Sequence, residues 1–514
     1  MPVVESMIRP DGDKARFVVW DLRTGEPVPA KTQGVEPALE GAFEITLSDG
    51  ARRTVRPAWS ILLERISLFS PEIASEITGV DADKIRKSAI VYAESSPGAC
   101  VNFMQGIEEH LNNTSAMRDI LCLMAITGNL DVKGGNVRIP FWNEMLGPRL
   151  TGDDPPAQME KKLGNTRCYP VSQPSAVWKA ILTEDPYPIK AFIVFAGNPL
   201  SWCEDPKYVE EALRKVEFLV AREYFMSPTA ELADIVLPSA HWLERDYIAD
   251  ELTGRYYFGQ QRAIDPLYER KSCITLMREL GRMVAPDWWP WETDEELFDF
   301  QLETVGITWK ELQNRWVYKY APETYRFYEK NWFETPSGLV EIYSNVLASV
   351  GGDPLPSYVP AVEPTDEYPF IIMTGRRYPN YYHSTFLNIS WLRSLEPHPK
   401  VDINPQAAQK LGINDGDLVW IESHAGKIQM FARLTNGIHP RNLSATHGWR
   451  MGCRELGLPG YPNHIANVNA LINSDAISPE FATPNLRCLP VKIYKAERSE
   501  IPGFPCLNLR EVQS

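Results

Sequence analysis

Polar residues follow two apolar segments near the middle of the chain. Gly197 and Asn198 come directly after the apolar run 191–196, and Arg222 and Glu223 come directly after the run 217–221. If both runs are parallel strands, their carboxyl ends meet at one edge of a sheet, where open α/β sheets bind ligands. Backbone N–H groups and an arginine at such an edge suit an anionic ligand. The spacing therefore predicts a ligand site of the nucleotide-binding type.

A βαβ unit is expected to position these residues. The run 191–196 is uninterrupted and apolar, which is typical of a strand buried on both faces. Asp205 and Pro206 have the residue types of an N-cap and a first helical position, and the apolar spacing that follows predicts a helix. The run 217–221 predicts the next strand, and 235–237 predicts a third that Pro238 ends. Such a unit implies a parallel sheet.

A second group of candidate residues surrounds the segment 106–114, which precedes an expected helix over 115–126. The apolar segment 99–106 favours a strand. Asn113 or Thr114 can cap the helix, whose first turn could bind an anion. Beyond the helix, two consecutive glycines beside a lysine could cradle a phosphate or form an ordinary loop. Taken alone, the residues favour the ordinary loop.

Composition and charge exclude several classes of protein. The 514 residues include 52 lysines and arginines and 67 aspartates and glutamates, a net charge of −15 without a basic block, which argues against a nucleic-acid partner. The eight cysteines show no close metal-ligand spacing. We find no signal peptide and no apolar run near the ~20 residues of a membrane span. A large α/β protein with an ordinary hydrophobic content is indicated.

The flanking regions predict further elements. Short strands at 17–20 and 43–46 indicate a β-rich excursion, and helices are expected at 58–69, from 70 onward and at 81–94. We expect the apolar stripes of these helices, such as Ile85 and Ile90, to be core.

The carboxyl-terminal region predicts a barrel. The segment 351–367 holds four prolines and two glycines and indicates a linker. Beyond it, strands are expected at 370–373, 418–422, 427–434 and 442–445, with one helix at 405–411 ended by Gly412. Short strands at this spacing with few helices favour a closed barrel.

Several short motifs, taken in order along nearly the whole chain, resemble the molybdopterin oxidoreductases of the dimethyl sulfoxide reductase family. The matching elements are 106–114, 127–135, Gly197-Asn198-Pro199, 229–238, 335–341, Thr374-Gly375-Arg376, Tyr382-His383-Ser384, 403–419, His447-Gly448-Trp449 and Asn467-Val468-Asn469. The opening segment 17–21 and a tryptophan-rich insert look closest to the branch with acetylene hydratase, transhydroxylases and catechol dehydroxylases. The resemblance implies an enzyme, specifically the catalytic subunit of a molybdopterin oxidoreductase.

The resemblance also implies a domain organisation. We expect a partial pterin-binding core with the β-rich excursion over 1–95, and a Rossmann-like α/β domain over 96–350. The linker 351–367 would lead to a β-barrel of the double-psi type over 368–514.

The cofactor that the resemblance implies is bis-molybdopterin guanine dinucleotide with molybdenum or tungsten. His110 would lie nearest the metal, and Glu109, where the family usually has glutamine, could act as an acid or base or be a surface residue. Glu223 and Asp234 are candidates to accept from guanine N–H groups, and Arg376 to bind phosphate. The full set of candidate cofactor-binding residues is Gly106, Asn113, Gly134, Gly135, Gly197, Asn198, Glu223, Thr229, Asp234, Thr374, Gly375, Arg376, His383, Ser384, His447, Asn467 and Asn469.

The sequence departs from the family at its start. Members begin with a cysteine-rich segment that binds a [4Fe–4S] cluster, followed by the residue that ligates the metal, and no residue here matches either. We therefore expect the chain to be the carboxyl-terminal portion of a larger protein and to be inactive by itself. A gene-model truncation or an upstream selenocysteine codon read as a stop are the hypotheses for the short start.

Three functions follow as alternatives. The first is an oxidoreductase portion with a small-molecule substrate and an iron–sulfur electron-transfer subunit as partner. The second is a non-redox hydratase or hydroxyl-transfer enzyme of the same family, and the third is an inactive pterin-binding fragment. We expect a soluble protein. Its compartment, cytoplasm or periplasm, stays open because an export signal would lie on the missing part.

Overall fold

The computed structural model describes most of the chain between residues 17 and 497. The described ranges are 17–30, 32–47, 49–103, 105–137, 162–164, 172–250, 256–319, 325–331, 333, 335, 337–374, 378–462, 465–478, 480–481 and 483–497.

The middle of the fold is a parallel three-stranded sheet. Strands β5 (Ala191–Phe195), β6 (Phe218–Glu223) and β7 (Ile235–Pro238) lie in that order, all parallel. Helices α9 (Pro174–Thr183) and α11 (Pro206–Lys215) cover one face, where Trp178, Leu213 and Leu219 form the core. The Asp205 carboxylate accepts from the Tyr208 N–H at 3.3 Å, so the predicted N-cap and βαβ unit are confirmed.

On the other face of this sheet the two edge strands are exposed, although Val220 of the central strand is buried, and the expectation that the first strand is buried on both faces is wrong. Ile193, Val220 and Ile235 are direct neighbours across the three strands, and Ile193 and Ile235 are 43% and 44% exposed. The physical reason is that β5 is an edge strand, and the described helices α9 and α11 pack on the opposite face.

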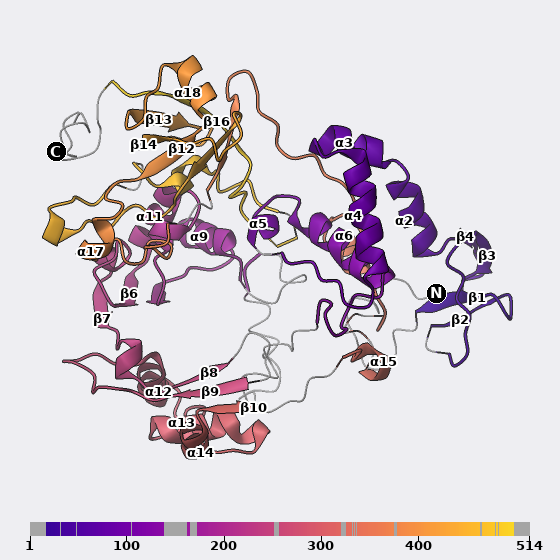
Figure 1. Cartoon of the computed structure of the whole chain (residues 1–514). Coiled ribbons are helices and arrows are strands. Elements are labelled where there is room, and N and C mark those ends of the chain that lie inside the picture. Colours follow the sequence, from indigo (N-terminus) through magenta and orange to yellow (C-terminus); the bar gives the residue numbers. More distant parts are fainter. Residues whose placement is uncertain are drawn as a thin grey trace.

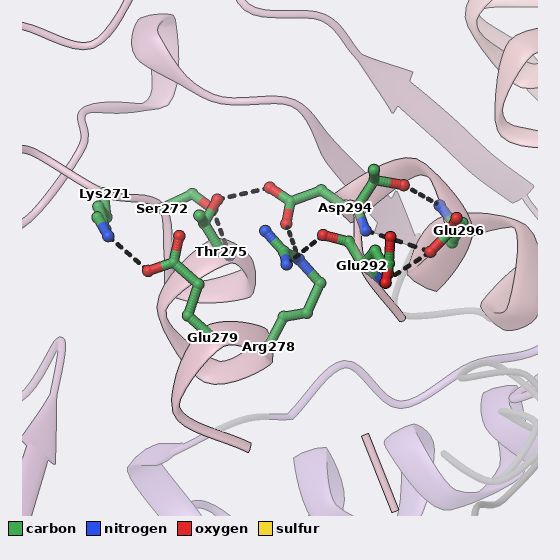
Figure 2. A network of polar contacts seen from close by, with 9 residues as sticks. Lys271, Ser272, Thr275, Arg278, Glu279, Glu292, Asp294 and Glu296 are labelled. Atoms are coloured by element: carbon green, nitrogen blue, oxygen red, sulfur yellow. Dashed lines mark hydrogen bonds and ion pairs between the residues drawn. The ribbon is translucent and has the colours of Figure 1, made fainter. Parts of the chain in front are cut away.

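A helical layer with its own core follows the sheet. Strands β8 (Tyr247–Asp250), β9 (Tyr256–Gln260) and β10 (Val317–Lys319) form an antiparallel sheet. Helices α12 (Cys273–Val284), α13 (Asp294–Leu302) and α14 (Trp309–Arg315) accompany it, together with the short turn η3 (Glu303–Val305). Figure 2 shows how α12 and α13 are joined: Arg278 donates to the Asp294 carboxylate at 2.7 Å and to the Glu292 carbonyl at 2.5 Å.

The amino-terminal region contains two hairpins and a helical group. The hairpins pair β1 (Val18–Asp21) with β2 (Glu26–Pro29) and β3 (Phe43–Thr46) with β4 (Arg52–Val55), which confirms the β-rich excursion. The helices are α2 (Ala58–Ile66), α3 (Pro71–Thr78), α4 (Ala82–Glu94), α5 (Gln105–Glu108) and α6 (Asn113–Ile126).

Two expectations for this region are wrong. Helix α4 has no buried residue and its Ile90 is exposed, because its only strong contact among the described elements is with α3. The described part of 99–106 is not a strand, because the Asn136 side chain bonds both the N–H and the carbonyl of Val101 at 2.9 Å. Those bonds occupy the backbone groups that a neighbouring strand would need.

The carboxyl-terminal region is the predicted closed barrel. Its six strands close in the order β11 (Phe370–Met373), β15 (Asn442–Ala445), β12 (Lys400–Ile403), β14 (Lys427–Leu434), β13 (Leu418–Glu422) and β16 (Leu489–Lys495). Helix α18 (Pro405–Leu411) ends at Gly412, whose φ of 66° is the left-handed conformation that glycine favours. The interior of the barrel holds the fully buried side chains of Val401, Ile421 and Met430.

Short elements connect these parts. They are α10 (Pro199–Trp202), η1 (Ala230–Leu232), η2 (Trp242–Glu244), α15 (Tyr328–Asn331), α16 (Asn345–Ser349), α17 (Ser390–Arg393), η4 (Arg454–Leu456) and η5 (Val468–Leu471). The described segment between Ser349 and Phe370 contains neither helix nor strand. Figure 1 shows the barrel above α9, α11, β6 and β7, the α12–α14 layer below them, and α2–α4 with α6 at the right.

Candidate functional site

A cavity of about 890 Å³ lies between the carboxyl edge of the parallel sheet and one end of the barrel. Side chains from the sheet, the α5 region and the barrel line it together. Nine of the predicted site residues are among them, namely Glu109, Gly197, Asn198, Glu223, Thr374, His383, Ser384, His447 and Asn469. The structure thus brings together residues from motifs that are far apart in the sequence.

On the sheet side, Asn198 is held in one orientation. Its Oδ1 accepts from the Thr229 hydroxyl at 2.8 Å, and its Nδ2 donates to the Ser201 hydroxyl at 2.8 Å. Thr229 is fully buried, so it positions Asn198 rather than lining the cavity itself. Asn198 therefore presents a fixed edge to the cavity, which suits recognition of a polar ligand.

Two buried asparagines fasten the barrel to the sheet. Asn469 Nδ2 donates to the Ser201 carbonyl at 3.3 Å, and Asn467 Nδ2 donates to the Leu200 carbonyl at 3.4 Å. Asn469 still lines the cavity, whereas Asn467 does not. The structure therefore gives Asn467 a positioning role at the junction beside the cavity.

The two predicted carboxylates lie at opposite edges of the sheet. Glu223, at the carboxyl end of β6, lines the cavity, and burial raises the pKa of its carboxyl. Asp234 precedes β7, and its Oδ2 accepts from the Leu219 N–H at 2.7 Å near the start of β6. The structure therefore brings Glu223 to the cavity and leaves Asp234 at the far edge.

On the barrel side, two histidines form a directed hydrogen-bond chain. His447 Nδ1 lies 3.3 Å from the Thr374 carbonyl, which can only accept, so this nitrogen carries the proton. In a neutral ring of this tautomer, His447 Nε2 accepts from His383 Nδ1, which lies 2.7 Å away. Gly448, with φ of 81°, lets its segment pass close to Ser384, because a Cβ at this position would lie 3.0 Å from the Ser384 Cβ.

An ion pair crosses the cavity wall between the α5 region and the barrel. Arg487 Nη2 lies 2.6 Å from Glu109 Oε2, with the two side chains 17% and 22% exposed. The Glu109 carbonyl also accepts from the Leu486 N–H at 3.2 Å, and the Thr374 hydroxyl donates to the Leu486 carbonyl at 2.6 Å. Glu109 therefore bonds the segment before β16 through both its side chain and its backbone, a contact that the sequence did not predict. We call these contacts of Glu109 with Leu486 and Arg487 the clasp.

His110 lies beside this clasp rather than among the residues that line the cavity. Burial lowers the pKa of its imidazole, the positive charge of Arg487 lowers it further, and a hydrogen bond to the Gly106 carbonyl opposes the shift. His110 is thus favoured in its neutral form.

The paired glycines support a tight loop. A Cβ on Gly135 would lie 2.3 Å from the Asn129 carbonyl oxygen, and one on Gly134 would lie 3.2 Å from the Gly98 backbone. The Gly135 N–H already donates to the Val132 carbonyl at 3.0 Å. Neither glycine lines the cavity, so the geometry agrees with the ordinary-loop alternative.

The remaining predicted residues lie elsewhere. Asn113 lines a different cavity of about 710 Å³, and its Nδ2 donates to the Glu108 carbonyl at 2.6 Å. Gly106 is exposed with open space around it. Gly375 and Arg376 lie outside the described residues.

Sequence reasoning also missed Arg270 and several aromatic residues. Arg270 lines the cavity and pairs at 2.8 Å with Glu244, whose pKa is lowered by the hydrogen bond from the His241 N–H and by Arg270. The cavity is further lined by Trp202, Tyr224, Phe225, His241, Trp242 and Phe386. Only their position after predicted strand ends could have signalled them.

Two searches of the described ranges gave negative results. No group of three or more histidine, cysteine, aspartate or glutamate side chains there is arranged to hold a metal ion. Among the helices of those ranges, we found none with the length and hydropathy needed to cross a bilayer.

Comparisons with known proteins agree with the geometry. Residues 98–283 match the family model described as molybdopterin oxidoreductase, and 370–489 match that of the molydopterin dinucleotide binding domain. Dopamine dehydroxylase of Eggerthella lenta is 30% identical over 93% of this chain and 58% of the relative. Acetylene hydratase of Syntrophotalea acetylenica is 30% identical over 83% of this chain and 64% of the relative.

The fold is similar to a solved structure as well. Acetylene hydratase from Pelobacter acetylenicus superposes with a TM-score of 0.75 at 29% identity, over 84% of this chain and 66% of that one. The chain spans about three fifths of the length of the curated relatives it matches.

Proposed function

Since the chain belongs to the molybdopterin oxidoreductases of the dimethyl sulfoxide reductase family, whose members are enzymes, we propose that the cavity between sheet and barrel binds molybdopterin guanine dinucleotide as part of a catalytic subunit. The observation that carries this proposal is the convergence of nine predicted site residues, eight of them from the family motifs, on one cavity. The metal, molybdenum or tungsten, and the presence of a second dinucleotide are part of the proposal.

The residues of the cavity fit such a group. The Glu223 carboxylate, at a strand end, can accept from the N–H groups of a guanine or pterin ring. Arg487 Nε is buried without a hydrogen-bond partner among the described residues, although it belongs to the cavity wall. Such a donor is costly to leave unpaired, so it favours a ligand with acceptor atoms.

The bound group would supply oxygen-atom, hydroxyl or electron transfer at its metal. The chain's own residues bind and orient it. Asn198 offers a fixed amide edge, the Glu109–Arg487 pair holds the α5 region against the barrel, and the cavity aromatics exclude water. Of the two histidines, His447 holds its proton at Nδ1 against the Thr374 carbonyl and offers Nε2 to His383.

A second candidate function is the non-redox addition or removal of water or a hydroxyl group. Two observations favour it: a carboxylate, Glu109, lines the cavity where the family usually has a glutamine, and the chain is similar to an acetylene hydratase in both sequence and structure. Either function would use a small-molecule substrate. The redox function would also need an electron-transfer subunit, for which we propose an iron–sulfur protein.

Metal analysis and turnover together test these functions. The purified chain is assayed for molybdenum and tungsten by mass spectrometry. Because we expect the chain to be inactive by itself, turnover is measured after the amino-terminal portion of a relative is supplied, with and without a viologen dye as electron donor or acceptor. Turnover that requires the dye supports the oxidoreductase, and turnover without it supports the hydratase. Absence of both metals would contradict both functions and favour the inactive fragment.

A further inference from the structure

A second cavity, of about 1120 Å³, adjoins the candidate cofactor cavity and is lined by an arginine of its own, Arg450. One wall is the segment after β6 with Phe225, Met226 and Glu231. Another is α17 with Trp391, together with Asn388 in the turn before it. Phe225, Asn388, Ile389 and Met451 line both cavities. The two spaces are therefore continuous neighbours, although most of the second lies away from the candidate cofactor site.

A rigid hairpin forms the floor of the second cavity. The chain turns back between Cys453 and Leu458, and a Cβ on Gly452 would lie 2.8 Å from the Gly460 nitrogen. Arg393 is fully buried beneath it and donates to the Met451 carbonyl at 3.3 Å. A floor packed this closely leaves little freedom to close the space, so the cavity is a built feature of the fold.

Arg450 belongs to this hairpin, and its guanidinium group makes one long ion pair and has one nitrogen without a hydrogen bond in the described part of the chain. Its side chain is only 14% exposed, and the nearest carboxylate that pairs with it, Glu210, lies 3.9 Å from Nη2, beyond hydrogen-bond distance. Nη1 is buried with no hydrogen-bond partner in the described part of the chain. A buried cationic donor of this kind is stabilised by an anionic planar acceptor, which a guanidinium binds in a two-pronged geometry.

The surrounding residues narrow the class of anion. Trp391 is 69% exposed and Phe225 is also exposed, so an apolar ring would gain contact area with both. Two carboxylates, Glu231 and Glu455, line the same cavity and would repel a dianion. The Asn388 side-chain oxygen, likewise buried without a partner among the described residues, can pair with a ring substituent.

We propose that this second cavity is a binding site for aromatic monocarboxylates, with the carboxylate on Arg450 and the ring between Phe225 and Trp391. The site adjoins the cofactor cavity and shares Phe225 and Asn388 with it, but its ligand is distinct from the cofactor and its test does not depend on the proposed function. Because Met451 and Asn388 belong to both walls, a ligand here would contact residues that also face the cofactor cavity.

Calorimetric titration of the full chain with three probes tests the proposal. Benzoate should bind, acetate should bind more weakly because it lacks the ring, and inorganic phosphate at pH 8 should not compete with benzoate. Arg450→Met should weaken benzoate binding by about 10-fold or more, since a charge-assisted hydrogen bond is lost. Arg450→Lys should restore part of the affinity because the charge returns.

A matched control uses the other arginine of the cavity. Arg454 is exposed, so Arg454→Met should change benzoate affinity by less than about 2-fold. Trp391→Ala should weaken benzoate binding and leave acetate binding unchanged. This change replaces no buried residue. The proposal is overturned if benzoate shows no saturable binding at millimolar concentration, if phosphate competes equally, or if the two Met variants behave alike. Circular dichroism confirms that each variant is folded.

Discussion

The ion pair between Glu109 and Arg487 makes a quantitative prediction about the junction of the α5 region with the barrel. Replacing Arg487 by Met leaves the Glu109 carboxylate partly buried without its cation. Breaking a fully buried pair costs about 3–5 kcal/mol. Here the side chains are 17% and 22% exposed, so solvent screening reduces the expected cost to about 1–3 kcal/mol.

Hydrogen exchange measures this effect where it occurs. Unfolding of the whole chain averages over several structural units, whereas local opening can be followed peptide by peptide. We expect Arg487→Met to accelerate exchange in peptides over 105–114 and 484–495, with β5–β7 unchanged. The double variant with Glu109→Gln should recover part of the loss, giving a coupling energy of about 1–2 kcal/mol.

A surface pair provides the control. Lys190 and Glu217 lie 3.7 Å apart with side chains 68% and 69% exposed, so the same cycle there should give about 0–0.5 kcal/mol. If the Glu109–Arg487 coupling is as small as that of the surface pair, or if exchange changes equally throughout the chain, the clasp does not hold the junction and the reasoning is refuted.

Three further predictions concern stability. Gly135→Ala should destabilise the chain by more than ~2 kcal/mol in thermal unfolding, since its Cβ would meet the Asn129 carbonyl at 2.3 Å. Gly106→Ala, which has open space around it, should be tolerated, and equal effects of the two variants would refute the steric argument. Asp205→Ala should cost about 1 kcal/mol by removing the N-cap of α11, and no change in urea unfolding would count against that cap. Burial lowers the pKa of His398 to about 4. Its neutral form therefore contributes stability that is fully present above pH ~6.5 and is lost as pH falls toward 4. His398→Phe should flatten that part of the stability–pH curve, and an unchanged curve would contradict the burial effect.

Local sequence signals predicted the elements whose ends are fixed by their own residues. The strands 418–422, 427–434 and 442–445 and the helix 405–411 have the predicted bounds, because turn residues such as Gly412 set them. Asp205 and Pro206 likewise begin α11. In each case the decisive chemistry is local and can be identified without knowing the tertiary contacts.

Elements that depend on distant contacts were not predicted correctly. The segment 99–103 has apolar residues typical of a strand, yet Val101 is bonded by the side chain of Asn136 rather than by a strand. Strand β16 was missed, although it closes the barrel between β11 and β13. Such outcomes depend on which segments meet in space, which local patterns do not encode.

The candidate site shows the same contrast between residues with a local sequence signal and residues that depend on distant contacts. Motif resemblance identified Asn198, His383 and His447, and the structure brings them to one cavity. Arg487 was not identified, because an arginine before a strand has no local signal and its partner Glu109 lies in a distant part of the chain. Asn467 was identified as a ligand contact, whereas its hydrogen bond to Leu200 gives it a positioning role.

Release of guanosine monophosphate tests the central proposal most directly. The chain is purified from an anaerobic, molybdenum-supplied host and hydrolysed in acid, which cleaves a pterin guanine dinucleotide. We expect guanosine monophosphate in stoichiometric amounts from the unmodified chain and a large loss in the folded Asn198→Leu and His447→Leu variants. No guanosine monophosphate from the unmodified chain, or variants that release as much of it as the unmodified chain, would contradict the assignment of this cavity to the dinucleotide.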